Sequence, residues 1–354
     1  MTLATTPRRR IALVAPARYP IREPYAGGLE AFCHTLVRAV RDLGHTVDLY
    51  AAAGSQGHVR AVELPGVTWS RNPLEASDTG YPPGARAAED AAFRRLARHL
   101  QRENYDIVHN NSLTPVLFGY GLPLLTTLHT PLLPEVRAAI VATGPQAGRV
   151  TAVSASTAAD WALPHPVSVI PNGVDTESWQ PGPGGEAAVW FGRIVPEKGL
   201  HLAMDACRMA GIPLLFAGRV GDHHYFSTEI VPRMTGQAAT WVGELDHAGL
   251  QNLVGRCRVC LVTPRWEEPF GLVAFEAMAS GTPVAAFRRG GLGDFLATAP
   301  AALATPDDVA SLAAAVHVAA GIDRAVVREW VVRHHSLREV ARRYAELYCE
   351  VPIR

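Results

Sequence analysis

The chain has 354 residues, of which 48% are hydrophobic, and its 33 Lys and Arg balance 33 Asp and Glu. This length suffices for about two domains with buried cores, and zero net charge argues against nucleic-acid binding or a polybasic membrane patch. No apolar run approaches the roughly 20 residues that cross a bilayer, and the start, with Arg8-Arg9-Arg10 before a strand-like run, does not resemble a signal peptide. We therefore expect a cytoplasmic protein without an integral membrane segment.

Predicted strands and helices alternate along the first half of the chain. One helix is predicted over residues 29–43, ending before Gly44 at a position that favours glycine, and another over 85–103. The second helix carries arginines for which we expect a solvated face: Arg94, Arg95, Arg98 and Arg102. Strands are predicted at 11–15, 46–51, 106–109, 124–129, 149–154 and 167–170. Buried strands with intervening helices indicate parallel βαβ units.

A turn-rich stretch without periodicity, residues 171–186, is the best linker in the chain. After it, strands are predicted at 188–191, 213–217, 259–263 and 283–287, and the tail from Asp307 is helical with breaks near Gly321 and Ser336. We expect two Rossmann-like α/β domains facing each other across a ligand-binding cleft. The predicted parts are a first domain (1–170), the linker (171–186), a second domain (187–334) and a C-terminal helix packing back on the first domain (335–354).

The five cysteines are too few and too scattered for a disulfide framework. Cys257-x-x-Cys260 has no second pair, and Cys260 lies in an apolar run that predicts a buried strand. The adjacent pairs His223-His224 and His334-His335 are expected at the surface or in loops, because neighbouring residues on a helix do not share a face. No metal site is predicted.

Gly27-Gly28 lies between the first strand and the first helix. It is not a dinucleotide fingerprint, because the third glycine and the acid after the second strand are missing. Two interpretations remain open: the glycines let backbone approach an anion at a helix N-terminus, or they form an ordinary loop.

The loop after the strand at 188–191 carries Arg193 and Lys198, five residues apart. A guanidinium fork and a compact ammonium on one Gly/Pro-shaped loop suit a diphosphate, although a solvated loop with two surface cations is the alternative. Lys198 is the only lysine in the chain, and the other 32 basic residues are arginines. Because every other basic residue is an arginine, the lysine at this one position favours anion binding by this loop.

The segment 267–278 follows the strand at 259–263 and includes Glu268, Pro269 and Glu276. Pro269 suits a first helical turn, and free amides at 270–273 would bind a phosphate. Eight residues of helix would separate the two glutamates by roughly 12 Å, too far for a glycosidase pair. They could instead accept hydroxyl hydrogen bonds at two ends of a nucleotide-sugar, although Glu268 alone could merely compensate a helix dipole.

Taken together, these motifs resemble the GT-B retaining glycosyltransferases of family 4. The resemblance covers most of the chain and rests on the following segments: Gly27-Gly28, 127–129, 153–154, 170–175, Gly192-Arg193, Lys198-Gly199, the pair Glu268 and Glu276, and 277–284. Gly290-Gly291-Leu292-Gly293-Asp294 departs mildly from the family's Gly-Gly-x-x-Glu.

The resemblance implies that the domain over 1–170 binds the acceptor and that the domain over 187–334 binds the nucleotide-sugar. It also implies roles for individual residues. Arg193 and Lys198 would hold the donor diphosphate, the amides of Phe270, Gly271, Leu272 and Val273 its distal phosphate, and Gly27-Gly28 would approach from the other domain. Glu276 matches the ribose ligand, Glu268 the ligand of the transferred sugar, and His129 the histidine beside sugar and acceptor. The nucleobase would lie near Gly243 and Leu245. Arg193, Lys198, Glu268 and His129 form the expected catalytic set.

We expect a bacterial-type hexosyltransferase that uses no cofactor, with a UDP-sugar favoured over a GDP-sugar. It is expected to be metal-independent, because no Asp-x-Asp occurs in the sequence. The acceptor would be a small molecule or glycoside bound near residues 18–25 and 71–84, where Tyr81 is either a sugar platform or part of a plain loop. A homodimer is left open. A phosphorylase or nucleotide-sugar epimerase on the same fold, and a catalytically silent binding subunit, are the alternatives.

Overall fold

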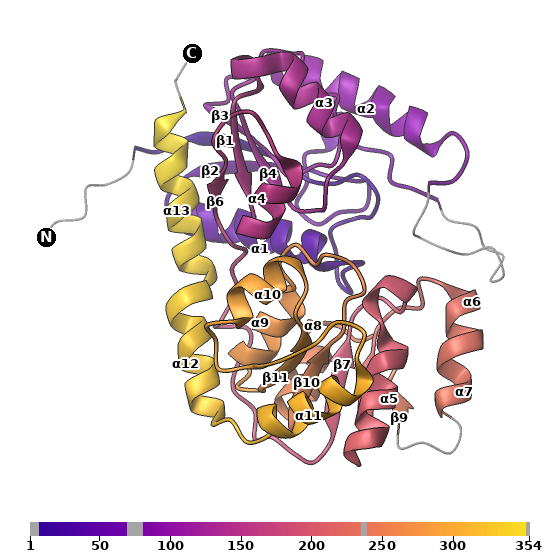
Figure 1. The fold of residues 1–354 in the computed structure, drawn as a ribbon. Helices are drawn as coiled ribbons and strands as arrows, with labels where there is room; N and C mark the ends of the chain where they lie inside the picture. Colours follow the sequence, from indigo (N-terminus) through magenta and orange to yellow (C-terminus); the bar gives the residue numbers. More distant parts are fainter. Residues whose placement is uncertain (1–6, 69–80, 235–238, 352–354) are drawn as a thin grey trace, which may run out of the picture. The chain divides into compact units, whose positions relative to one another are not determined.

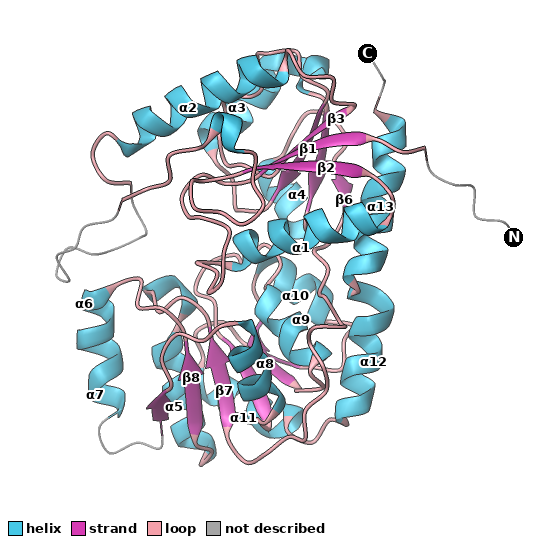
Figure 2. Cartoon of the chain, turned by 180° about the vertical axis from the view of Figure 1, so that it is seen from behind, coloured by secondary structure: helices cyan, strands magenta, loops and turns pink. Residues whose placement is uncertain are grey.

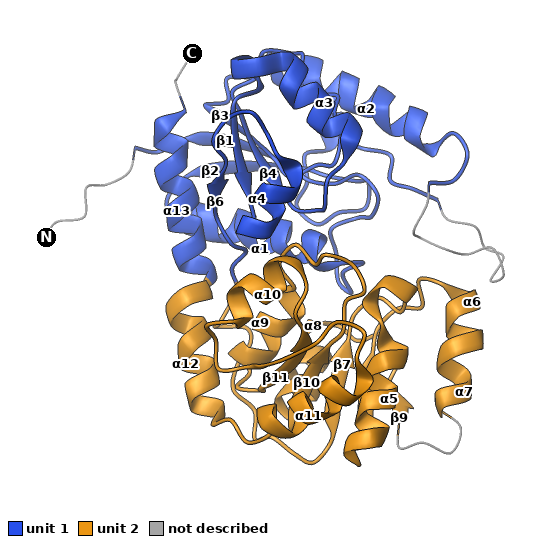
Figure 3. Cartoon of the chain, in the orientation of Figure 1, with its two compact units in different colours: residues 1–68, 81–173, 337–354 blue, residues 69–80, 174–336 orange. Residues whose placement is uncertain are grey.

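The computed structural model describes residues 7–68, 81–234 and 239–351 (Figure 1). Two compact units share these residues (Figure 3). The first contains 7–68, 81–173 and 337–351, and the second contains 174–234 and 239–336. Within the described ranges, the chain passes directly from one unit to the other after Gly173 and after Ser336.

The first unit is built on a six-stranded parallel sheet of order β2-β1-β3-β4-β5-β6. Figure 2 draws strands in magenta and labels β1, β2, β3 and β6 of this sheet. Its strands are β1 Arg10–Val14, β2 Thr46–Tyr50, β3 Ile107–Asn110, β4 Leu124–Leu128, β5 Arg149–Ala152 and β6 Ser168–Val169. Each predicted strand is confirmed within two residues. Strands β3 and β4 are completely buried. β4 is a run of leucine and threonine, whereas β3 ends in the buried polar residues His109 and Asn110.

The helices of the first unit are α1 Gly28–Asp42, α2 Ala85–Leu100, α3 Pro134–Thr143, α4 Ala155–Trp161 and α13 Leu337–Glu350, with short 3-10 turns at Arg60–Val62 and Gly144–Ala147. In α1, Phe32, Cys33, Leu36, Val37 and Val40 recur at helical spacing and are buried. Gly44, just beyond α1, has a φ of 92°, as its predicted C′ position requires. Arg94, Arg95 and Arg98 on α2, and Arg102 just after it, are exposed, which confirms the solvated face.

The C-terminal helix α13 is anchored in the first unit by a buried polar network. The two ring nitrogens of His109 lie 2.9 Å from the Tyr348 hydroxyl and 2.9 Å from Thr127 Oγ1. Thr127 Oγ1 lies 3.2 Å from the Tyr344 hydroxyl. Burial lowers the pKa of His109 to about 3, so the ring is neutral and can donate at one nitrogen and accept at the other.

The second unit contains another six-stranded parallel sheet, of order β12-β11-β10-β7-β8-β9. Its strands are β7 Ala188–Phe191, β8 Leu214–Ala217, β9 Ala239–Trp241, β10 Val259–Val262, β11 Val284–Phe287 and β12 Ala302–Ala304. The sequence missed β9 and β12, which are three-residue strands at the two edges and too short to show a pattern. Strand order reverses between β7 and β10, and ligands of open α/β sheets bind at such a switch point.

The helices of the second unit are α5 Leu200–Ala210, α6 His223–Tyr225, α7 Val231–Met234, α8 His247–Gly255, α9 Leu272–Ala279, α10 Gly290–Leu296, α11 Val309–Ala319 and α12 Arg324–His335, with a 3-10 turn at Pro196–Lys198 and a π-helix at Phe226–Ile230. The predicted breaks near Gly321 and Ser336 are confirmed. Within the described ranges, no single helix is long and apolar enough to span a membrane; α11 and α12, bent by 99°, pass that test only as a pair.

One expectation about these helices is wrong: His335 is buried. Its position on α12, four residues after Val331 and eight after Val327, places it on the buried face. Its ring lies 4.5 Å from that of Phe275 and 5.2 Å from that of Phe295. His334 on the adjacent face is exposed, as expected.

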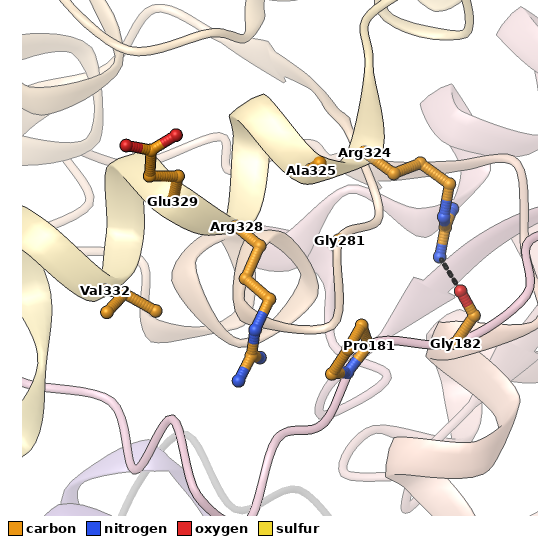
Figure 4. A pocket seen from close by; sticks show the side chains of 8 residues that line it. All are labelled: Pro181, Gly182, Gly281, Arg324, Ala325, Arg328, Glu329 and Val332. Atoms are coloured by element: carbon orange, nitrogen blue, oxygen red, sulfur yellow. Dashed lines mark hydrogen bonds between the residues drawn. The ribbon is translucent and has the colours of Figure 1, made fainter.

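Two arginines of α12 hold the segment after Gly173 against the second unit. Arg324 donates to the carbonyl oxygens of Gly182, Gly255, Cys257 and Ser280, over 2.9–3.4 Å. Arg328 donates to the carbonyl oxygens of Thr176 and Trp179, at 2.9 and 2.6 Å. Both side chains line a hollow of about 410 Å³ (Figure 4), formed by Pro181, Gly182, Gly281, Arg324, Ala325, Arg328, Glu329 and Val332.

We expect Arg324→Met to lower the free energy of unfolding by about 2–4 kcal/mol, because it removes the hydrogen bonds to all four carbonyl oxygens and leaves those of Gly182 and Cys257 without the donor that holds them. Urea unfolding measures the loss. Arg333→Met is the matched control on the same helix: it removes only an exposed ion pair with Glu329, which is worth about 1 kcal/mol at most. Equal losses in the two variants would show that Arg324 does not hold this segment.

Candidate functional site

The predicted donor-binding residues of the second unit all follow strands of one parallel sheet. Arg193 and Lys198 follow β7, and Gly243 and Leu245 follow β9. The residues after β10 are Glu268, Phe270, Gly271, Leu272, Val273 and Glu276. Because the strands are parallel, these segments emerge at the same edge of the sheet, and those after β7 and β10 flank the switch point.

The loop carrying Lys198 is held against the end of β10. Thr263 Oγ1 lies within hydrogen-bond reach of the carbonyl oxygens of Lys198, at 2.9 Å, and Gly199, at 3.1 Å. The Arg265 amide donates to the Glu197 carbonyl at 2.8 Å. Gly199 has a φ of 66°, and a Cβ there would lie 2.2 Å from the Thr263 carbonyl oxygen. Only glycine therefore fits this approach of the two loops.

The structure brings Lys198 and Glu268 into direct contact. Lys198 Nζ donates to Glu268 Oε2 at 2.6 Å, and the two side chains are 27% and 11% exposed. Trp266 Nε1 donates to the same oxygen at 2.9 Å, and Lys198 Nζ lies 5.0 Å from the centre of the Trp266 ring. Glu268 is therefore an ion-pair partner rather than a dipole-compensating acid. Sequence reasoning missed Trp266, although an aromatic residue two positions before Glu268 was visible.

Arg193 lies on the same loop as Lys198, beside an acid of that loop. Its Nη2 atom is 3.7 Å from Glu197 Oε1, and both side chains are about one quarter exposed. A guanidinium in this environment keeps its charge and part of its surface in solvent. Arg193 and Lys198 thus supply two cations beside the switch point, as the sequence predicted.

The start of α9 differs from the sequence expectation. The helix begins at Leu272 and not at Pro269, because Gly271 takes a left-handed conformation with φ of 82° that separates the loop from the helix. The helical spacing of roughly 12 Å between Glu268 and Glu276 is therefore wrong, since Glu268 lies on the loop. The amides of Leu272 and Val273 begin the helix and have no acceptor within it.

Glu276 is a partly buried acid within α9. Burial raises its pKa to about 7, because transfer from water disfavours the charged form. No residue in the described part of the chain donates a hydrogen bond to its carboxylate. Phe270, in contrast, is 2% exposed and stacks on Phe275 with ring centres 4.3 Å apart, so only its backbone is available to a ligand.

In the first unit, Gly27 and Gly28 lie at the N-terminus of α1, with Gly27 as the N-cap residue. A Cβ on Gly27 would lie 3.0 Å from Glu30 Oε2, so the Glu30 carboxylate occupies space beside the first turn. An acid here stabilises the helix dipole. Donor binding by Gly27 and Gly28 stays a prediction.

His129 follows β4 and is fixed by a residue that follows the neighbouring strand β3. Asn111 Nδ2 donates to the His109 carbonyl at 3.3 Å, which turns Asn111 Oδ1 towards His129 Nε2 at 2.8 Å. His129 Nε2 therefore carries the hydrogen, and Nδ1 is left as an acceptor. Burial lowers the pKa of His129 to about 3, so the ring is neutral. Asn111 was missed; its position after an adjacent strand was the available signal.

Tyr81 does not present a free ring to the solvent. The Arg18 guanidinium lies 4.7 Å and the Arg86 guanidinium 5.4 Å from the ring centre. Such cation–π contacts occupy the aromatic surface. Residues 71–80 of the expected acceptor region lie outside the described residues.

The CxxC pair is buried and reduced. Cys257 and Cys260 are free thiols, and burial raises the pKa of Cys257 to about 11. Neither side chain is therefore a thiolate at neutral pH. In the described ranges, no three His, Cys, Asp or Glu side chains gather as metal ligands would.

Comparison with known proteins gives matches in both units. The sequence model of Glycosyltransferase Family 4 matches residues 26–178, and that of Glycosyl transferases group 1 matches 176–319. A glycogen synthase of Mycobacterium tuberculosis is 35% identical over 161 residues, 42% of this chain and 39% of that protein. The match thus spans less than half the length of that relative.

Two other similar proteins cover nearly the whole chain. A D-inositol 3-phosphate glycosyltransferase of Jonesia denitrificans is 27% identical, over 97% of this chain and 93% of its own. The solved structure of Anabaena HepE in complex with UDP and glucose has a TM-score of 0.73 at 19% identity, covering 97% of this chain and 100% of that one. With the two parallel sheets, this similarity confirms the predicted two-domain Rossmann-like α/β fold, GT-B.

We expect Gly199→Ala to destabilise the protein by about 3 kcal/mol or more, because the new Cβ collides with the Thr263 carbonyl. Gly211→Ala is the matched control: its φ is 67°, nearly that of Gly199, but nothing lies within 4 Å of the new Cβ. Its cost should be about 1 kcal/mol, from the left-handed backbone alone. Urea unfolding measures both, and equal losses would contradict the close approach.

Glu276 should make stability depend on pH. The folded protein holds a proton that the unfolded chain releases between pH 4.5 and about 7, so the free energy of unfolding falls as pH rises through this window. Relative to Glu276→Gln, the wild type should lose up to about 3 kcal/mol between pH 4.5 and 8. Urea unfolding of both proteins at a series of pH values measures the difference. Parallel curves would contradict the raised pKa.

Proposed function

The chain belongs to glycosyltransferase family 4 and is a glycosyltransferase, and from this premise we propose that it transfers a hexosyl unit, with retention, from a nucleoside-diphosphate sugar to a hydroxyl acceptor. The contact of Lys198 with Glu268 at the switch point carries this proposal. It joins a cation suited to a diphosphate to an acid suited to sugar hydroxyls, on two loops that meet where α/β sheets bind ligands.

In the proposed complex, the donor lies along the carboxyl edge of the second sheet. Arg193 and Lys198 bind the diphosphate, the amides of residues 270–273 its distal phosphate, and Glu276 the ribose. A hydroxyl of the transferred sugar donates a hydrogen bond to Glu268, and the base lies near Gly243 and Leu245. The free helix amides and the unpartnered Glu276 carboxylate support these assignments.

The proposed chemistry is a front-face displacement in which the departing phosphate takes the acceptor proton. Catalysis then consists mainly of stabilising the leaving group, by charges already in position. Lys198, Arg193 and the start of α9 would supply this stabilisation, so we propose that the reaction needs no metal ion and no cofactor.

We propose that the first unit binds the acceptor and that His129 contacts a reacting hydroxyl. A neutral ring with Nδ1 as acceptor and Nε2 tied to Asn111 supports hydrogen bonding. It does not support a positively charged imidazolium at pH 7.

UDP is our proposed donor nucleotide, in line with the UDP bound to Anabaena HepE. The experiment that tests the function combines a thermal-shift screen against UDP, GDP, dTDP and ADP with donor turnover over an acceptor panel that includes D-inositol 3-phosphate. A bound nucleotide raises the free energy of unfolding by RT ln(1 + [L]/Kd), and the melting temperature rises as a result. Sugar phosphate or an epimer, formed from donor alone with or without phosphate, would instead indicate a phosphorylase or epimerase.

Lys198→Ala is expected to lower kcat by about 10²–10³, the effect of removing one preorganised donor to the leaving group. Lys198→Arg should also be impaired, because a planar fork does not reproduce a point charge. Steady-state kinetics with and without EDTA measure both effects, and Arg208→Ala, an exposed cation on α5, is the control. Unchanged turnover in both Lys198 variants would remove this residue from the mechanism, and loss of wild-type activity in EDTA would contradict metal independence.

A further inference from the structure

Two donors converge on one oxygen of Glu268. Lys198 Nζ and Trp266 Nε1 both donate to Oε2, at 2.6 and 2.9 Å. Nothing else in the described part of the chain donates to Oε1. A carboxylate oxygen accepts two hydrogen bonds, so Oε2 is saturated by protein groups while Oε1 remains available to a ligand hydroxyl.

The two donors differ in how they respond to an anionic ligand. Lys198 reaches Glu268 through a flexible four-carbon stem, and a diphosphate would compete with Glu268 for its ammonium. The Trp266 side chain is rigid by comparison, and its N–H carries no net charge. An arriving anion therefore draws the ammonium far more strongly than the indole.

Neighbouring backbone holds the main chain of Glu268 in place, so the direction of its carboxylate depends on side-chain rotation. The Glu268 carbonyl lies 3.4 Å from the Leu292 amide nitrogen, which donates to it. Gly290 packs so closely that a Cβ there would lie 2.6 Å from the same carbonyl oxygen. With the main chain held, the hydrogen bond from Trp266 determines which carboxylate oxygen faces a ligand.

We propose that Trp266 is a positioning residue: it holds Oε2 of Glu268 while the donor engages Lys198, and so keeps Oε1 available to a hydroxyl of the transferred sugar. The inference rests on the proposed function and extends it to the selection of the donor sugar. It assigns to the indole N–H a role in sugar recognition that is separate from nucleotide binding.

Two substitutions separate the N–H from the aromatic ring. Trp266→Phe keeps an aromatic face beside Lys198 and removes the donor. Trp266→His keeps a donor at the same place, because imidazole Nε2 and indole Nε1 are both two bonds from Cγ. Measurements at pH 8 keep the histidine neutral, given its ordinary pKa of about 6.5. Trp330→Phe, on α12, is the control for replacing a tryptophan elsewhere.

For Trp266→Phe we expect a rise of about tenfold or more in KM for the UDP-sugar, the effect of losing a hydrogen bond to a charged group. Discrimination between epimeric donor sugars should fall by a similar factor. The Kd of UDP, measured by calorimetry, should stay within about threefold, because Glu268 does not contact the nucleotide. Trp266→His should recover most of the loss, and Trp330→Phe should behave like the wild type.

Wild-type KM and sugar discrimination in Trp266→Phe would overturn the proposal. Equal impairment of the Phe and His variants would also overturn it, because the ring and not the N–H would then matter. Failure of the proposed function gives a different result: the wild type itself would neither bind a nucleotide nor turn over any donor, which overturns both proposals.

Discussion

The hydroxyl of Thr263 joins two loops of the second unit, the half of the chain for which we propose donor binding. It lies 2.9 Å from the Lys198 carbonyl oxygen and accepts the indole N–H of Trp190 at 3.1 Å. Thr263 comes directly after β10, and the Lys198 loop comes directly after β7, its neighbour in the sheet. This one side chain therefore sets the spacing that lets Lys198 reach Glu268, and the glycine at 199 is needed for the same approach.

The electrostatics of this half reduce the repulsion that two acids would exert on an anionic ligand. Glu268 is neutralised by Lys198, and burial raises the pKa of Glu276 to about 7. An unpaired buried carboxylate would be costly, whereas a pair held by a further hydrogen bond is tolerated. The arrangement leaves acids able to accept hydroxyl hydrogen bonds without creating a strongly negative site.

In the first unit, hydrogen bonds between neutral side chains take the place of the ion pair. Asn111 and His129 follow adjacent parallel strands, and their hydrogen bond fixes the tautomer of the histidine. On the same strands, His109 and Thr127 meet the tyrosines of α13. The strands β3 and β4 therefore both hold α13 and position His129.

The sequence by itself determined the two α/β units, the strands of the sheet interiors and the loops that carry Arg193, Lys198 and Glu268, because long apolar runs and Gly/Pro punctuation are local signals. It did not reveal the three-residue edge strands, the start of α9 or the burial of His335 among aromatic rings. Only the tertiary structure decided that Lys198 pairs with Glu268, that Trp266 shares the same oxygen and that Asn111 orients His129. The ion pair and the Asn111–His129 contact join residues 70 and 18 positions apart, and strand order, which local patterns do not encode, brings such residues together.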